Sequence, residues 1–222
     1  MKDLGPLRYF LGIEVAFSPK GYFLSRAKYV NEVIHRVSLS DTKISDTPIE
    51  LNVKVYTIDG VPLNDPTLYR ELVGCLVYLM VTRPDLAYAI HVVNQFVSTP
   101  RCTHCTALVQ ILRYFRGTIF QGLLLSYTSS LELVAYADAD WAGDITDRKF
   151  IFSFRMFLGD SLITWKSKKQ TVVAYSIAEA EYRPMTHVTV EIHPQSDSIL
   201  FPFVSLALQL AFFTKIHTTA RF

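Results

Sequence analysis

The stretch from Glu132 to Tyr182 constrains the fold of this chain more than any other part of the sequence. It begins with an acidic cluster in the run AYADADWAGD and ends with a second one in the run AYSIAEAEYRPM. Two apolar runs typical of β-strands separate the clusters, which contain Asp138, Asp140, Asp144, Glu179 and Glu181. Grouped carboxylates of this kind predict a site that holds divalent metal ions on oxygen ligands.

Alternation of side chains indicates a β-strand at residues 131–140. Tyr136, Asp138 and Asp140 share one side of this strand, whereas leucine and alanine residues share the other. The runs IFSFRMFLGD and SLITWKS follow as two more strands, joined by a tight turn at residues 159–161. The sequence therefore predicts a meander of three antiparallel strands, with two carboxylates on one face near the end of the first strand.

A helix is predicted to begin at Ser176, because Ser176 and Glu179 match a capping box. In this motif the serine accepts a hydrogen bond from the third helical amide, and the glutamate reaches back to the start of the helix. Glu179 therefore has a structural explanation. Glu181 has none, and it shares with Ile177 and Met185 a helix face that we expect to look inward. A carboxylate on such a face is costly unless it is paired or coordinates a cation, so Glu181 is the better functional candidate.

The N-terminal part of the chain predicts a hairpin, a helix and an extended connector. Alternating apolar residues over positions 8–25 flank a turn sequence at positions 18–21, which indicates two strands. The run RAKYVNEVIHRV places its apolar residues at helical spacing and predicts a helix packed on this hairpin. From Ser38 to Thr67 the periodicity fades and prolines recur, which is typical of a connector.

Three apolar helices are predicted next. The runs PTLYRELVGCLVYLMVT and DLAYAIHVVNQFV are separated by Arg83, Pro84 and Asp85, and the run HCTALVQILRYFRGT ends at Gly117. Together they form a compact helical module without a paired nucleophile and base. Its outward arginines, including Arg113 and Arg116, suit phosphate contacts, although a solvated helix face is the commoner explanation for such residues.

Composition narrows the class of protein. The apolar fraction is 50%, with 15 phenylalanines and 12 tyrosines, so the chain is globular rather than disordered. A formal net charge of +2 does not indicate nucleic-acid binding. A basic surface, if the chain has one, would have to be local. Cys75, Cys102 and Cys105 neither form an even disulfide framework nor complete a zinc site, and the N-terminus lacks a signal-peptide core. We therefore expect an intracellular location, cytoplasmic or nuclear.

Several long motifs follow one another in a fixed order: KDLGPLRYFLGIEV, YRELVGCLVYLMVTRPDLAYAI, ILRYFRGT, AYADADWAGD, FLGDSLITWKSKKQTVVA and AEAEYR. In this order they resemble copia-type retrotransposon Pol polyproteins. The resemblance implies that residues 1–67 are the end of the reverse transcriptase region and a connector, residues 68–120 a helical connection, and residues 121–191 a truncated RNase H-like domain. Residues 192–222 form an apolar tail without a counterpart in the family.

The resemblance implies an α+β fold, an incomplete ribonuclease H-like mixed sheet preceded by a hairpin and the helical connection module. The implied ancestral activity is metal-dependent hydrolysis of RNA in RNA–DNA hybrids, with Mg²⁺ or Mn²⁺ as cofactor, nucleic acid as partner and no small-molecule substrate. By motif position, Asp138 resembles the first catalytic aspartate and Glu181 the catalytic glutamate, and both would hold metal. Asp140 is not at a catalytic position of the family, although its face allows a supporting role. The candidates for nucleic-acid contacts are Arg113, Arg116, Lys166, Lys168 and Lys169.

Departures from the family predict that this activity is lost. The polymerase aspartates of the family precede KDLG, so no polymerase activity is expected of these residues, and the further RNase H carboxylates have no match after Glu191. Where the family reads Arg-Arg-Ser-Thr-Ser-Gly-Tyr, this chain reads RKFIFSF. Pro184 replaces an alanine inside the helix, where proline costs about 3 kcal/mol and predicts a kink just after Glu181. The chain therefore resembles a pseudoenzyme.

The tail offers a further hypothesis. Its apolar run from Ile199 to Phe213 is 15 residues long and contains Pro202. A membrane span needs about 20 residues, so membrane association is not expected. Three functions follow from the sequence as hypotheses: a truncated, inactive RNase H-type fragment, a nucleic-acid-binding module without catalysis, and a membrane-tethered remnant. The oligomeric state stays open.

Overall fold

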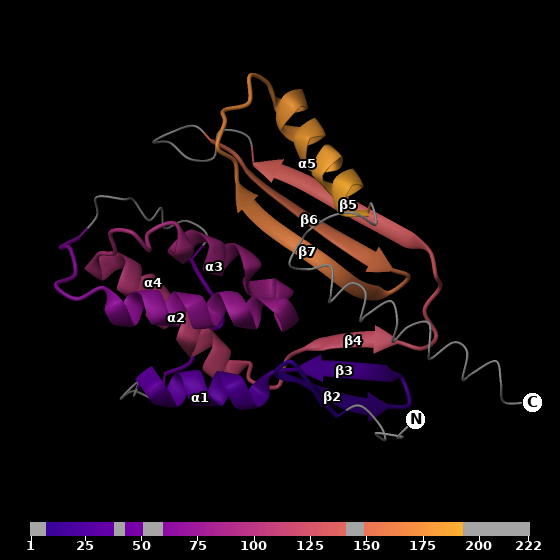
Figure 1. The fold of residues 1–222 in the computed structure, drawn as a ribbon, viewed down its shortest axis with the longest axis horizontal. Coiled ribbons are helices and arrows are strands. Elements are labelled where there is room, and N and C mark those ends of the chain that lie inside the picture. Colours follow the sequence, from indigo (N-terminus) through magenta and orange to yellow (C-terminus); the bar gives the residue numbers. More distant parts are fainter. Residues whose placement is uncertain (1–7, 38–42, 51–59, 141–148, 193–222) are drawn as a thin grey trace, which may run out of the picture. The chain divides into compact units, whose positions relative to one another are not determined.

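A computed structural model describes residues 8–37, 43–50, 60–140 and 149–192. Within these ranges the chain is an α+β protein with two antiparallel sheets and five α-helices (Figure 1). The mixed sheet that the resemblance implies is not seen there, since no parallel strand pair occurs among the described residues. The chain divides into two compact units, of which the first comprises residues 1–16 and 24–123 and the second comprises residues 17–23 and 124–222.

The N-terminal hairpin belongs to a sheet with the strand order β1-β2-β3-β4. Its strands are β1 (Tyr9–Phe10), β2 (Ile13–Ser18), β3 (Gly21–Ser25) and β4 (Leu123–Ser126). The predicted hairpin is confirmed, because β2 and β3 flank the turn at residues 19–20.

The prediction of one unbroken strand before this turn is wrong. A two-residue turn at Leu11 and Gly12 splits it, and both residues have positive φ, 48° and 76°. Glycine adopts such angles freely, whereas a non-glycine residue pays about 1–3 kcal/mol for them. The turn escaped the sequence pattern because Leu11 fits the apolar alternation of a strand.

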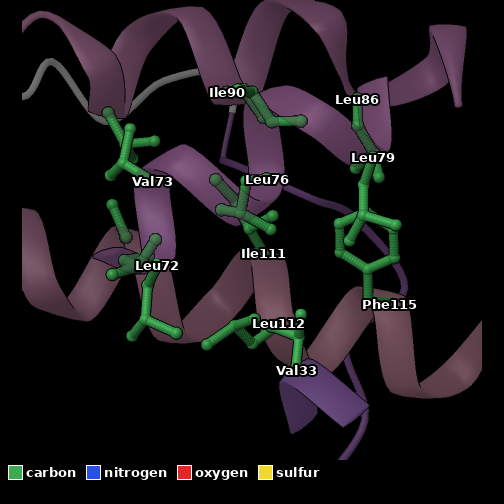
Figure 2. Packing of buried hydrophobic residues seen from close by; sticks show 14 of the residues in the cluster. Val33, Leu72, Val73, Leu76, Leu79, Leu86, Ile90, Ile111, Leu112 and Phe115 are labelled. Carbon is green, nitrogen blue, oxygen red and sulfur yellow. The ribbon is translucent and has the colours of Figure 1, made fainter. Parts of the chain in front are cut away.

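The predicted helices are confirmed in the first unit. They are α1 (Ala27–Val37), α2 (Thr67–Leu79), α3 (Ala87–Asn94) and α4 (Cys102–Gly117). Their apolar faces meet in one core, in which Leu76, Ile111 and Phe115 are at most 1% exposed (Figure 2). Burying a side chain of this size stabilises the fold by about 1.5–3 kcal/mol.

The interruption between α2 and α3 is also confirmed. Two short 3₁₀ turns, η1 (Met80–Thr82) and η2 (Pro84–Leu86), flank Arg83, which is extended with φ −133° and ψ 73°. Proline disfavours the helical conformation of the residue before it, so Pro84 explains why the helix cannot continue through Arg83.

The second unit contains the predicted antiparallel meander. Its strands are β5 (Leu133–Asp140), β6 (Ile151–Leu158) and β7 (Ser161–Lys169), in the order β5-β6-β7. Alternate residues of β6 are buried, and Phe152 and Phe154 are at most 2% exposed. The helix α5 (Ile177–Ile192) packs along β5 and β6 (Figure 1). It does not end at Pro184, which lies within it.

None of the helices in the described ranges is both long enough and apolar enough to cross a membrane. The apolar run at residues 199–213 lies outside those ranges.

Candidate functional site

Asp138 lies on an exposed part of β5, two residues before the end of the strand. Cross-strand pairing places it directly opposite Ser153 of β6, which in turn pairs with Ser167 of β7. Directly opposite residues of an antiparallel pair point to the same face, so one carboxylate and two hydroxyl groups form a row across the sheet. The Oγ of Ser167 is buried and makes no hydrogen bond.

The structure describes the neighbouring aspartates less completely than Asp138. Asp140 is the last residue of β5 and pairs with Ile151. Asp144 lies outside the described residues. Asp138 is therefore the aspartate of this strand for which the structure describes both the side-chain exposure and the cross-strand register.

The capping motif at the start of α5 is present. The Glu179 amide donates to Ser176 Oγ at 3.1 Å, as predicted. The Glu179 carboxylate reaches one residue further back than expected and accepts from the Tyr175 amide at 2.7 Å. Its other oxygen accepts from Arg183 Nε and Nη2, at 3.1 and 2.6 Å. Arg183 was missed by the sequence pattern, although its spacing of four residues from Glu179 signals a helical ion pair.

Glu181 does not lie on an inward-looking face, which corrects the sequence-based expectation. Ile177 is 57% exposed, Met185 is 53% exposed, and Glu181 between them is exposed as well. The buried side of α5 is instead formed by Ala180 and Pro184. A solvated carboxylate carries no desolvation penalty, so burial does not by itself require a cation at Glu181.

The described residues do not fit a two-metal centre. Asp138 and Glu181 lie on elements that pack together, but no group of three His, Cys, Asp or Glu side chains in the described ranges could hold a metal ion. Two ions bridged by carboxylates need more oxygen ligands than these two side chains supply.

Cys102 and His104 of α4 have structural partners. Cys102 Sγ accepts from the Val61 amide at 3.3 Å. His104 is buried, stacks on Phe96 with ring centroids 3.9 Å apart, and accepts from the Arg101 amide at 3.0 Å. These contacts explain His104 as a cap of the helix rather than as a ligand.

The candidate nucleic-acid contacts fall into two groups. Arg113 and Arg116 lie on α4 in the first unit, whereas the lysines lie on β7 in the second. Lys166 and Lys168 alternate along β7 and share one face, and Lys169 lies on the other. The five candidate cations therefore belong to two units that are described separately.

The Glu179–Arg183 pair gives a testable titration. The guanidinium of Arg183 and the Tyr175 amide hold the pKa of Glu179 below its ordinary value. Because the folded pKa is depressed, the pair stabilises the helix above the pKa of an unfolded glutamate and loses this effect as pH falls through the folded value. We expect NMR titration of the Glu179 carboxyl carbon to show the depressed pKa and Arg183→Ala to raise it. Arg155→Ala, which removes an exposed arginine on β6, should leave it unchanged; equal shifts in both variants would contradict the assignment.

Sequence comparison relates the chain to plant transposon proteins. It is 41% identical over 86% of its length to the retrovirus-related Pol polyprotein from transposon RE1 of Arabidopsis thaliana, and it spans 13% of that polyprotein. It is 35% identical over 86% of its length to the retrovirus-related Pol polyprotein from transposon TNT 1-94 of Nicotiana tabacum, and it spans 15% of that protein. It is also 38% identical to an uncharacterized mitochondrial protein of Arabidopsis thaliana, of which it covers 80%. No domain-family profile and no solved structure matches the chain.

Proposed function

Since the chain belongs to the family of copia-type retrotransposon Pol polyproteins, we propose that residues 121–191 are an incomplete RNase H-like domain that does not cleave RNA by itself. The ancestral activity would be metal-dependent hydrolysis of the RNA strand in RNA–DNA hybrids. The chain spans only a small part of the transposon polyproteins it matches, 13% and 15% of their lengths.

The packing of α5 on β5 is the observation that supports an RNase H-like domain. It sets the helix that bears Glu181 against the strand that bears Asp138. The resemblance implies the same two elements for the first catalytic aspartate and the catalytic glutamate. The antiparallel meander β5-β6-β7 supports the proposal as well, since it supplies the sheet on which such a site would be built.

The small number of candidate metal ligands supports the proposed lack of RNA cleavage. Mg²⁺ or Mn²⁺, when bound in such a centre, activates a water molecule and stabilises the leaving oxygen. The chain's own contribution would be to fix both ions with convergent carboxylates, and the described residues provide no third ligand beside Asp138 and Glu181. Both side chains are exposed, so an ion between them would keep most of its water shell and bind weakly.

A cleavage assay tests the proposal. The full chain is incubated with a labelled RNA–DNA hybrid in Mg²⁺ and, separately, in Mn²⁺. We expect no more product than from Asp138→Asn, because neither protein assembles two ions. Asp160→Asn, which changes an exposed aspartate in the turn between β6 and β7, serves as the matched control. Cleavage by the wild type and by Asp160→Asn that Asp138→Asn abolishes would overturn the inactivity.

A further inference from the structure

The first unit contains a pocket that the proposed function does not use. Its volume is about 420 Å³, within the range of small-molecule sites. The β1–β2 turn, α1 and the end of α2 form its walls. The lining residues are Tyr9, Gly12, Lys28, Tyr29, Glu32 and Tyr78.

Hydrogen bonding and close packing fix the aromatic walls. The Tyr78 hydroxyl donates to the Leu11 carbonyl at 2.7 Å, which ties α2 to the strained turn. A Cβ atom at Gly12 would lie 2.5 Å from this hydroxyl, so a larger residue there would have to displace the Tyr78 side chain. Tyr29 meets Tyr78 edge to face, with ring centroids 5.2 Å apart. Burial raises the pKa of Tyr29 to about 12, so its hydroxyl stays neutral near pH 7.

A buried cation lies behind the aromatic wall. Arg26 is 2% exposed, its guanidinium stacks 3.6 Å from the centre of the Tyr78 ring, and Nη1 donates to the Tyr78 carbonyl at 2.7 Å. Nε and Nη2 are buried without a hydrogen-bond partner, and no carboxylate of the described residues forms an ion pair with Arg26. A buried charge of this kind is unfavourable until an anion comes near.

The charges at the pocket favour a negatively charged ligand. The Arg26 guanidinium stacks on the ring of Tyr78, which lines the pocket, and this contact places its charge next to the pocket. Lys28 adds an exposed ammonium group on the lining itself, and Glu32, one turn further along α1, is the one acid among the lining residues. The sum is one excess positive charge beside aromatic walls.

We propose that this pocket binds a small aromatic anion, that is, one or two fused planar rings carrying a phosphate or carboxylate group. The ring packs against the tyrosine walls, as offset or edge-to-face aromatic pairs do. The anionic group meets Lys28, and Arg26 attracts it through the low-dielectric wall. All of these residues belong to the first unit, so the proposal does not depend on the RNase H-like domain.

Calorimetric titration of the full chain tests the proposal with three probes. They are 1-naphthyl phosphate, which has ring and anion, 1-naphthol, which has the ring alone, and inorganic phosphate, which has the anion alone. We expect saturable binding of 1-naphthyl phosphate, with each partial probe at least about tenfold weaker, since one charge-assisted hydrogen bond changes affinity by about this factor. Equal affinity for either partial probe would overturn the proposed ligand class.

Charge variants then locate the site. Lys28→Gln should weaken 1-naphthyl phosphate about tenfold, whereas Glu32→Gln should strengthen it, because it removes the one negative charge of the lining. Opposite effects of two exposed substitutions on one helix cannot come from misfolding. Lys43→Gln, at an exposed lysine outside the pocket, is the matched control and should change nothing. If Lys28→Gln binds as tightly as the wild type, or Glu32→Gln binds less tightly, the proposal fails.

Discussion

Replacing Phe152 with alanine is expected to lower the free energy of unfolding of the second unit by about 3–5 kcal/mol. Phe152 is 0% exposed in the middle strand of the meander. Its ring stacks on Phe154, with centroids 6.4 Å apart and an interplanar angle of 12°. Alanine would remove the ring from a packed interior and leave a cavity that the neighbouring strands cannot close.

Urea unfolding followed by tryptophan fluorescence measures this effect. Trp165 is buried in β7 of the second unit. The signal therefore reports on that unit. Tyr175→Ala is the matched control, because Tyr175 is an aromatic residue of the same unit that is 96% exposed. It should change stability by less than about 0.5 kcal/mol. A loss below about 1 kcal/mol in Phe152→Ala would contradict the buried packing.

The result bears on how the departures from the family pattern are interpreted. The resemblance places small polar residues where this chain has Phe150 and Phe152, and the sequence analysis counts this departure among those that predict loss of activity. Both phenylalanines are 0% exposed. They are part of the core of the second unit, so these substitutions are compatible with a fold that is still well packed, whatever became of the activity.

Local periodicity predicted most helices and strands, because the spacing of apolar residues that defines a buried face lies within a single element. It failed at Leu11, where tertiary contacts hold a bulky residue at positive φ. It also failed on the face of α5. An apolar stripe through Ile177 and Met185 resembled an inner face, but the small residues Ala180 and Pro184 form the buried side. Which stripe meets a sheet depends on how closely the helix can approach, and sequence spacing does not encode this.

The candidate site was predictable only in part for a similar reason. The position of Asp138 on a strand and the cap at Glu179 follow from short-range patterns. The row from Asp138 through Ser153 to Ser167 depends on strand register, which also shifts at an irregularity between Met156 and Phe157. A register of this kind is set by turns and tertiary packing. The pocket beside Arg26 joins three separate elements and has no local signal at all.

Replacing Arg83 with methionine is expected to lower the free energy of unfolding of the first unit by about 1.5–3 kcal/mol, because it removes charge-assisted hydrogen bonds made by a buried side chain. Arg83 is 3% exposed and makes a fork to Asp85, with Nε–Oδ1 3.0 Å and Nη2–Oδ2 2.8 Å. It also donates to the Thr118 carbonyl and hydroxyl, at 3.0 and 2.8 Å, and lies 4.9 Å from the centre of the Phe115 ring. One side chain thus joins the break after α2 to the end of α4.

Hydrogen exchange of the most protected amides of α4 measures this loss, because the most protected amides of a core helix exchange through unfolding of the whole unit. Arg83→Lys separates charge from geometry. Lysine keeps the positive charge but cannot form the planar fork, so most of the loss should persist. Arg8→Met removes an exposed arginine of the same unit and should change stability by less than about 0.5 kcal/mol. If Arg83→Lys restores wild-type exchange, charge alone holds the junction. If it does not, the planar guanidinium contacts to Asp85 and Thr118 do.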